Sequence, residues 1–183
     1  MSDPFLDETT ALLARTPRVV RELLDGLPAS WLDTPDTADG WTPRDVVGHL
    51  ISAELEAWIP RVEIILEHGP DRPFTSFDRF AHVERDPEAK LPELIDRFAE
   101  LRTANLRRLA GLVEDGDLDR VGRHPVLGEV TLRELLATWA VHDLDHLAQA
   151  YAALAGSHDE AVGPWKAYLG ILLRRDDPSA QPG

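Results

Sequence analysis

The sequence predicts an all-α protein, an antiparallel four-helix bundle with an additional short helix near the C-terminus. Four long segments repeat apolar residues at spacings of three and four, which is the period of one helix face. Clear N-terminal capping patterns precede two of these segments, and no segment has the pattern of a credible strand. Helices that lack a sheet bury their apolar faces against one another, so we expect a bundle.

Length and composition fit one packed domain. The chain has 183 residues, of which 43% are hydrophobic and 28% charged, and these are ordinary values for a globular protein. We assign residues 1–173 to a single domain and residues 174–183 to a disordered tail. No stretch approaches the roughly 18 apolar residues of a membrane span, and the N-terminus lacks the pattern of a signal peptide. We therefore expect no membrane partner and a cytoplasmic location.

Charge and cysteine content narrow the partners and ligands. The formal net charge is −14, from 33 acidic and 19 basic residues. This charge would repel nucleic-acid phosphates, so we expect no nucleic-acid partner. The sequence has no cysteine, which excludes disulfides, thiolate metal ligands and a cysteine nucleophile. Any metal site must use nitrogen and oxygen ligands. Bundles of this size often pair through a helix face, so we also expect a homodimer.

Prolines and glycines set the limits of the first predicted helix. It begins after Ser2 or Asp3, with Pro4 in its first turn, and ends at Gly26. Pro17 should bend it, because proline removes one internal hydrogen bond. The polar residues 27–40 then form a loop.

Four agreeing features mark the start of the second helix in the stretch WTPRD. Thr42 can cap the helix, Pro43 suits its first position, and Asp45 completes a capping box. The tryptophan before them can pack against the first turn. This helix is predicted to run to Gly69 with a kink at Pro60.

The second half of the chain contains the remaining helices. A third helix is predicted over residues 91–112, after a linker rich in proline and aromatic residues. The stretch EDGDLDRVGRHPVLGEV has turn residues and a short alternating piece, which we interpret as a hairpin-like loop. Thr131 and Glu134 form a second capping box, from which the fourth helix runs to about Leu154. A short fifth helix fits Ala161–Leu172.

Two histidines in the stretch VHDLDHLAQA form a candidate metal pair. His142 and His146 lie four residues apart, so adjacent turns place their rings about 6 Å apart on one inward seam with Trp139. His49 lies at the edge of the apolar face of the second helix and is the best third ligand. Three neutral nitrogens would leave positions open for water and substrate. The spacing alone also fits two core histidines with separate hydrogen-bond partners.

Several polar residues near these histidines are candidates for supporting roles. Asp145 and Glu56 could act as general bases on a metal-activated water, although exposed acids are common on helices. Asp143 falls inside the apolar face and should need a partner such as an arginine. Gln149 could bond a ligand or satisfy the core, and Asp45 could orient His49 besides capping its helix. The other four histidines are expected at the surface: His68, His82, His124 and His158.

The motifs GWTPRDVVGHL and GEVTLRELLATWAVHDLDHLAQA resemble the two signatures of the DinB/YfiT-like superfamily of metal-dependent enzymes. The likeness spans most of the chain. It implies that His49, His142 and His146 hold a divalent metal inside a four-helix bundle. It also implies a small-molecule substrate and either hydrolysis or transfer of a low-molecular-weight thiol, which would be a cofactor. We expect zinc or nickel as the metal, since imidazole suits both.

A non-catalytic reading stays open beside the enzymatic one. The protein could be a ligand-binding or dimerising helical module in which the metal only stabilises the bundle. A fourth protein ligand would favour that reading, because structural sites are coordinatively full. Residues 27–40 and 70–90 are expected to shape the mouth of the site.

Overall fold

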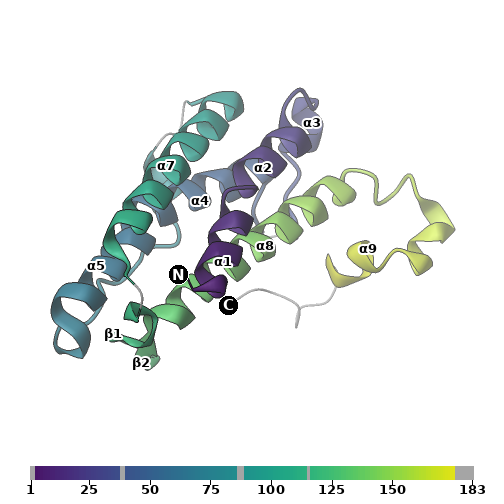
Figure 1. The fold of residues 1–183 in the computed structure, drawn as a ribbon. Helices are drawn as coiled ribbons and strands as arrows, with labels where there is room; N and C mark the ends of the chain where they lie inside the picture. Colours follow the sequence, from purple (N-terminus) through teal and green to yellow (C-terminus); the bar gives the residue numbers. More distant parts are fainter. Residues whose placement is uncertain (1–2, 38–39, 86–88, 115, 176–183) are drawn as a thin grey trace.

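The computed structural model describes residues 3–37, 40–85, 89–114 and 116–175, which form a helical bundle with one small hairpin (Figure 1). The interrupted helices α1/α2 and α4/α5 and the long helices α7 and α8 make up the bundle. The α-helices are α1 Pro4–Leu13, α2 Thr16–Leu24, α3 Ala29–Leu32, α4 Pro43–Glu56, α5 Trp58–His68, α6 Ala81–Arg85, α7 Leu91–Leu112, α8 Leu132–Gly156 and α9 Gly170–Arg175. The remaining elements are the strands β1 Val121–His124 and β2 Gly128–Thr131 and the 3-10 helices η1 Gly69–Asp71, η2 Asp117–Asp119 and η3 Gly163–Tyr168.

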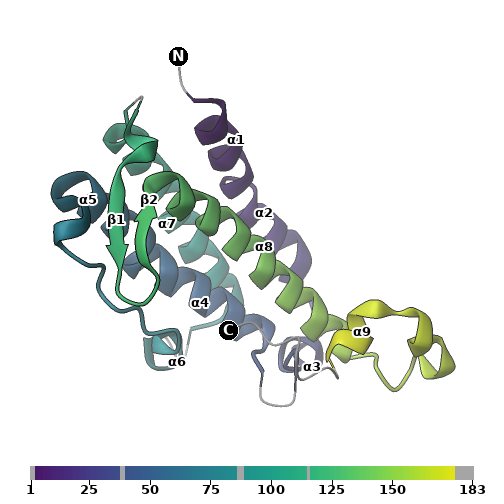
Figure 2. The same ribbon diagram turned by 90° about the horizontal axis from the view of Figure 1, so that it is seen from below.

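The α4/α5 pair lies between α7 and α8 and contacts both of them, while α1 packs on α8 and α2 packs on α7. The hairpin lies beside α5, and α9 packs against α8 near the C-terminal end of that helix (Figures 1 and 2). None of the helices formed by the described residues is both long and apolar enough to cross a membrane.

The first predicted helix is broken rather than bent. It divides into α1, which ends at Leu13, and α2, which begins at Thr16. Pro17 has no N–H to donate to the carbonyl of Leu13, so the helical ladder stops there. That carbonyl instead accepts a hydrogen bond of 2.8 Å from Nη1 of Arg102 on α7.

The second predicted helix is also broken, at Ala57 between α4 and α5. Pro60 cannot bond to the carbonyl of Glu56, and its ring crowds that carbonyl, which explains a break three residues before the proline. The predicted capping box is present. Oγ1 of Thr42 accepts from the Asp45 N–H at 3.2 Å, and Asp45 Oδ2 accepts from the Thr42 N–H at 2.9 Å.

The expectation that the chain has no credible strands is wrong for the hairpin. Strands β1 and β2 pair antiparallel, with Val121 opposite Thr131. Strands of four residues are too short to give a convincing alternating pattern, and this hairpin depends on packing for its stability. A side chain at Gly122 would place a Cβ only 2.5 Å from Cγ1 of Ile65, so glycine permits close approach to α5.

The predicted fifth helix, Ala161–Leu172, is two shorter elements. Gly163, with φ of 53°, begins η3, and Leu169 separates η3 from α9. Glycine and proline at the start of this segment weaken a continuous α-helix. The expected tail begins too early, because residues 174 and 175 belong to α9. The rest of that tail lies outside the described residues.

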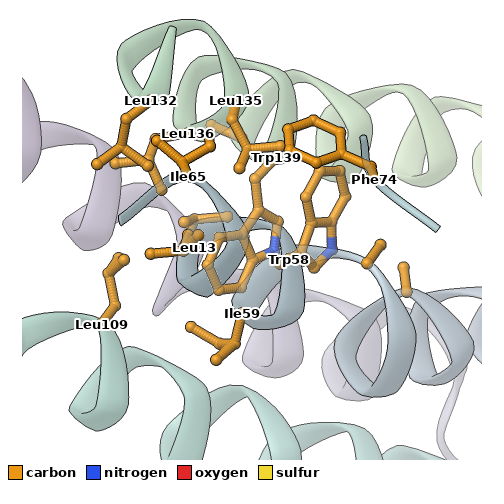
Figure 3. Packing of buried hydrophobic residues seen from close by; sticks show 14 of the residues in the cluster. Leu13, Trp58, Ile59, Ile65, Phe74, Leu109, Leu132, Leu135, Leu136 and Trp139 are labelled. Carbon is orange, nitrogen blue, oxygen red and sulfur yellow. The ribbon is translucent and has the colours of Figure 1, made fainter. Parts of the chain in front are cut away.

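Two adjoining apolar clusters form the core. The first contains Trp58 and Trp139, whose rings stack with centroids 5.5 Å apart, and Figure 3 shows their neighbours. The second contains Leu50 of α4, Phe98 of α7 and Ala150 of α8. On α8, His142 and His146 therefore lie between Trp139 of the first cluster and Ala150 of the second.

Candidate metal centre

The three predicted metal ligands converge on one point between α4 and α8. Nε2 of His142 lies 3.1 Å from Nε2 of His49 and 3.2 Å from Nε2 of His146. His49 and His146 are buried and His142 is half-buried. The helical spacing places two rings on successive turns of α8, and the third comes from 93 residues earlier in the chain.

These separations fit nitrogens that share one metal ion. Two nitrogens held about 2.0–2.1 Å from a tetrahedral ion lie about 3.3 Å from each other. The ligand atoms of the three residues all lie within 4.8 Å of one another, and the cluster could hold a metal ion.

Hydrogen bonds on the far side of two rings fix which nitrogen faces the centre. Nδ1 of His49 lies 3.2 Å from the carbonyl oxygen of Arg79, and Nδ1 of His146 lies 2.9 Å from Oε1 of Gln149. Both oxygens accept, so both Nδ1 atoms carry the proton in the neutral rings. The two Nε2 atoms then present lone pairs to the centre, which is the arrangement that orients metal-binding histidines.

His142 cannot satisfy both of these lone pairs. A neutral His142 has one proton to donate from Nε2, so one of the other two Nε2 atoms would face a nitrogen without a hydrogen between them. Its Nδ1 is buried and has no hydrogen-bond partner among the described residues. The ring instead contacts Trp58 edge to face at 5.0 Å. A cation at the centre would satisfy all three Nε2 lone pairs together.

The surroundings keep the three rings neutral. Burial, followed by the nearby His146, lowers the pKa of His49 to about 3. Burial and the two neighbouring imidazoles lower the pKa of His142 to about 2. Burial also lowers the pKa of His146, against the opposing effect of its bond to Gln149. Neutral imidazole is the form that binds metal ions, so protons compete weakly for this site at neutral pH.

Comparison with known proteins places the chain in a family. The model of the DinB superfamily matches residues 12–150, a segment that contains all three histidines. The chain belongs to the DinB superfamily.

Relatives of this DinB-superfamily chain carry a common description. A protein from Bacillus mycoides, named "putative metal-dependent hydrolase", is 25% identical over 152 residues, covering 81% of this chain and 84% of the relative. A Bacillus cereus protein of the same name is 27% identical over 152 residues and covers 81% and 82%.

A solved structure is similar in fold. YfiT from Bacillus subtilis is described as "a probable metal-dependent hydrolase with an unusual four-helix bundle topology". It matches with a TM-score of 0.70 and 24% identity, over 88% of this chain and 90% of YfiT. The DinB/YfiT bundle predicted from the sequence is confirmed. The stretch that the sequence predicted as a hairpin-like loop is a small two-stranded hairpin.

Aromatic residues enclose the histidines of this DinB protein. Trp41, just before α4, stacks on His146 with centroids 5.7 Å apart and lies 4.7 Å from His49. Phe77 contacts His49 edge to face at 5.5 Å, and Phe80 contacts Trp41 at 6.1 Å. The segment between α5 and α7 therefore contributes one side of the site, and it also supplies the Arg79 carbonyl.

His82 corrects one sequence prediction. It was expected at the surface, but its ring is buried against Trp41 at 5.0 Å. Gly48 on α4 makes room for it, because a Cβ there would lie 3.1 Å from the Cβ of His82. Both His82 and His49 face the carbonyl of Arg79 through Nδ1. Its position in a linker gave no periodicity from which burial could be predicted.

A buried ion network lies on the other side of His142. Asp143 accepts two hydrogen bonds from Arg102, at 2.6 and 3.0 Å, which confirms that this aspartate needs an arginine partner. Glu54 of α4 accepts from Arg102 and, at 3.1 Å, from Nε1 of Trp139. Burial raises the pKa of Glu54, although Arg102 opposes that shift.

Sequence reasoning missed Glu54. It lies three residues after Ile51 and four after Leu50, both in the core, so the argument applied to Asp143 would have found it.

The two candidate bases lie in different surroundings. The Glu56 carboxylate is exposed and pairs with Arg85 of α6. Asp145 is exposed beside His146, and its negative charge opposes the fall in the pKa of that histidine. Asp45 is occupied by capping, with Thr42 Oγ1 bonded at 2.7 Å, whereas the Arg79 carbonyl faces Nδ1 of His49.

Proposed function

We propose that this DinB protein is a metal-dependent hydrolase of a small molecule, with His49, His142 and His146 as the ligands of one divalent ion. The observation that carries the proposal is the convergence of three Nε2 atoms, two of them held in the metal-binding tautomer by hydrogen bonds behind the ring. Zinc and nickel are the proposed occupants, since imidazole ligands suit both. The names of the relatives support hydrolysis.

The residues around the ion would divide the work of such a reaction. A divalent ion in this site supplies Lewis acidity, which activates water for attack at neutral pH. The three histidines orient the centre, and the aromatic side chains of Trp41 and Phe77 exclude bulk solvent from it. Asp145, which is exposed beside His146, is the proposed acceptor of the proton from water.

The donor set favours an open site over a structural one. Among the described residues, the cluster that could hold a metal contains the three histidines and no fourth histidine or carboxylate. Three protein ligands leave at least one position for water and substrate, whereas structural zinc sites have four. This supports the enzyme over the non-catalytic module with a structural metal.

Metal content is the first test. We expect about one zinc or nickel per chain by plasma mass spectrometry in untagged protein, and none in the triple variant His49→Ala, His142→Ala, His146→Ala. A matched control replaces the same number of histidines at His68, His124 and His158. Equal metal content in the wild type and the triple variant would contradict the proposal, provided that circular dichroism shows both to be helical.

Reaction class needs a second test. Zinc- and nickel-loaded protein is offered p-nitrophenyl esters, and separately monochlorobimane with bacillithiol or mycothiol. We expect hydrolysis that is lost in the triple variant. Metal-dependent conjugation without hydrolysis would replace the hydrolase with a thiol S-transferase, whose thiol must come from outside because the chain has no cysteine.

A further inference from the structure

Two arginines lie near the three histidines. Arg61 lies on α5, one turn after Trp58, and Arg79 lies in the segment that covers His49. Neither makes an ion pair with a carboxylate of the described residues. Most arginines with a resolved partner pair with acids, as expected in a chain with 33 acidic and 19 basic residues. Such pairs are Arg21–Asp96, Arg85–Glu56, Arg102–Asp143, Arg108–Glu63, Arg120–Asp117 and Arg133–Asp3.

Arg61 is half-buried on α5, one turn after Trp58, whose ring contacts that of His142 at 5.0 Å. Its Nε is buried and has no hydrogen-bond partner among the described residues, and its guanidinium lies over the ring of Phe74 at 5.6 Å. Burial lowers the pKa of Arg61, and its positive charge contributes to the low pKa of His142. A buried cation without a counter-ion is costly, so this position favours an anion that is brought in from solution.

Arg79 lies next to His49, because its carbonyl oxygen faces Nδ1 of that histidine. Its guanidinium lies 5.4 Å from the ring of Trp41 and 5.2 Å from that of Phe80, so two aromatic rings hold it in place. Trp41 itself contacts both His49 and His146. The charge of Arg79 contributes to the lowered pKa of both histidines. Stacking leaves the edge of a guanidinium available for an oxyanion.

We propose that Arg61 and Arg79 form an oxyanion-binding subsite beside the three-histidine centre, so that the substrate of the proposed reaction carries a carboxylate or a phosphate. This inference rests on the proposed function. Guanidinium groups bind both oxyanions through paired N–H donors. Asp145 and Asp143 are acidic groups near His146; Asp145 is exposed to solvent, and Asp143 is paired with Arg102. The subsite would fix the orientation of the substrate relative to the metal.

The test uses cobalt-loaded protein and two simple oxyanions. Acetate and inorganic phosphate are titrated while the visible absorption of cobalt is followed, with acetamide as the uncharged analogue. We expect saturable binding of at least one anion and no response to acetamide. The variants Arg61→Gln and Arg79→Gln should each raise the apparent Kd about tenfold, with the anion-free cobalt spectrum unchanged. Arg107→Gln removes the same charge from an exposed position on α7 and should leave the Kd unchanged.

Parallel measurements separate failure of this inference from failure of the metal site. If cobalt binds but the Kd of both anions is the same in the wild type and both variants, the subsite is wrong while the metal site stands. If the protein does not bind cobalt, the metal-free protein is titrated with each anion by calorimetry. Equal anion affinity of the wild type and of the double variant Arg61→Gln, Arg79→Gln in that titration would also overturn the subsite. Tighter binding of acetate than of phosphate assigns a carboxylate, and the reverse order assigns a phosphate. If Arg61→Gln does not fold, Arg61→Lys keeps the charge, loses the planar fork and should weaken binding several-fold.

Discussion

Gln149 has a definite task at the centre, because its side-chain oxygen holds the proton of His146 on Nδ1. Gln149→Leu removes that acceptor, so the His146 ring can turn or take the other tautomer. We expect metal affinity to fall about tenfold to a hundredfold, the range for lost partners of ligand histidines. Competition with a coloured chelator measures it. Gln149→Glu keeps an acceptor and should retain the affinity, and a Leu variant that binds as tightly as the wild type would remove this role.

Arg102 is a second residue whose environment fixes its effect. Its five N–H groups all bond to Glu54, Asp143 and the Leu13 carbonyl. Burial lowers the pKa of Arg102, but the bonds and charges of Asp143 and Glu54 outweigh it and leave that pKa above its ordinary value. Pairing with Asp143 and Glu54 therefore keeps the Arg102 guanidinium charged despite its burial.

Arg102→Met should destabilise the protein by about 3–5 kcal/mol, because it leaves two buried carboxylates without a cation. Urea denaturation of metal-free protein measures the change. Arg108→Met is the matched control on the same helix, where the arginine pairs with Glu63 at the surface, and it should cost less than about 1 kcal/mol. Equal losses in the two variants would mean that the buried network contributes little.

At the scale of helices and strands, the close packing of the hairpin on α5 depends on Gly122. A Cβ there would meet Cγ1 of Ile65 at 2.5 Å and the ring of Phe74 at 3.0 Å. Gly122→Ala should therefore lower the free energy of unfolding by about 1–3 kcal/mol. Gly111→Ala on α7 meets nothing within 4 Å and should be neutral or slightly stabilising. A thermal melt of both variants distinguishes these outcomes, and a Gly122→Ala protein as stable as Gly111→Ala would contradict the packing argument.

Local sequence predicted the helices well where their ends carry chemistry of their own. The capping boxes at Thr42 and Thr131 and the whole of α7 were correct. The prolines were recognised, but whether a proline bends or breaks a helix depends on what takes the freed carbonyl. At Leu13 that group is Arg102, a residue 89 positions away. The strands β1 and β2 depend in the same way on distant packing partners.

The candidate site, too, could be predicted from the sequence only in part. Spacing and the apolar seam made His142 and His146 candidates, the family resemblance selected all three histidines as ligands, and the three do meet. Arg79 and His82 could not be found in this way, because they lie in a segment without helical period whose path is set by contacts with α4 and Trp41. The homodimer stays a prediction.

For the molecule as a whole, the neutral histidines predict a pH dependence of stability. In the unfolded chain His49 and His142 have the ordinary pKa of about 6.5, whereas folding lowers these values to about 3 and about 2. Below pH 6.5 the unfolded chain therefore binds protons that the folded chain does not. The contribution of these two histidines to the free energy of unfolding is therefore fully present above pH 6.5 and is lost as the pH falls towards 3.

Urea midpoints of metal-free protein between pH 7 and pH 5 measure this loss. We expect the free energy of unfolding to decrease as the pH falls over this interval, and the slope to be smaller in the variant His49→Gln, His142→Gln. The substitution His68→Gln, at an exposed position, should leave the slope unchanged. Identical slopes in wild type and the double variant would show that these histidines titrate alike in both states.

The bond between Arg102 and the Leu13 carbonyl exists because Pro17 leaves that carbonyl free. The two positions should therefore vary together over the history of the family. A relative with another residue in place of Pro17 can continue the helix through this point, since its own N–H would occupy the carbonyl. In such a relative, an arginine at the position of Arg102 would lose one hydrogen-bond acceptor, so selection for arginine there should be weaker. Through this bond the N-terminal helix joins the same network that borders the metal centre.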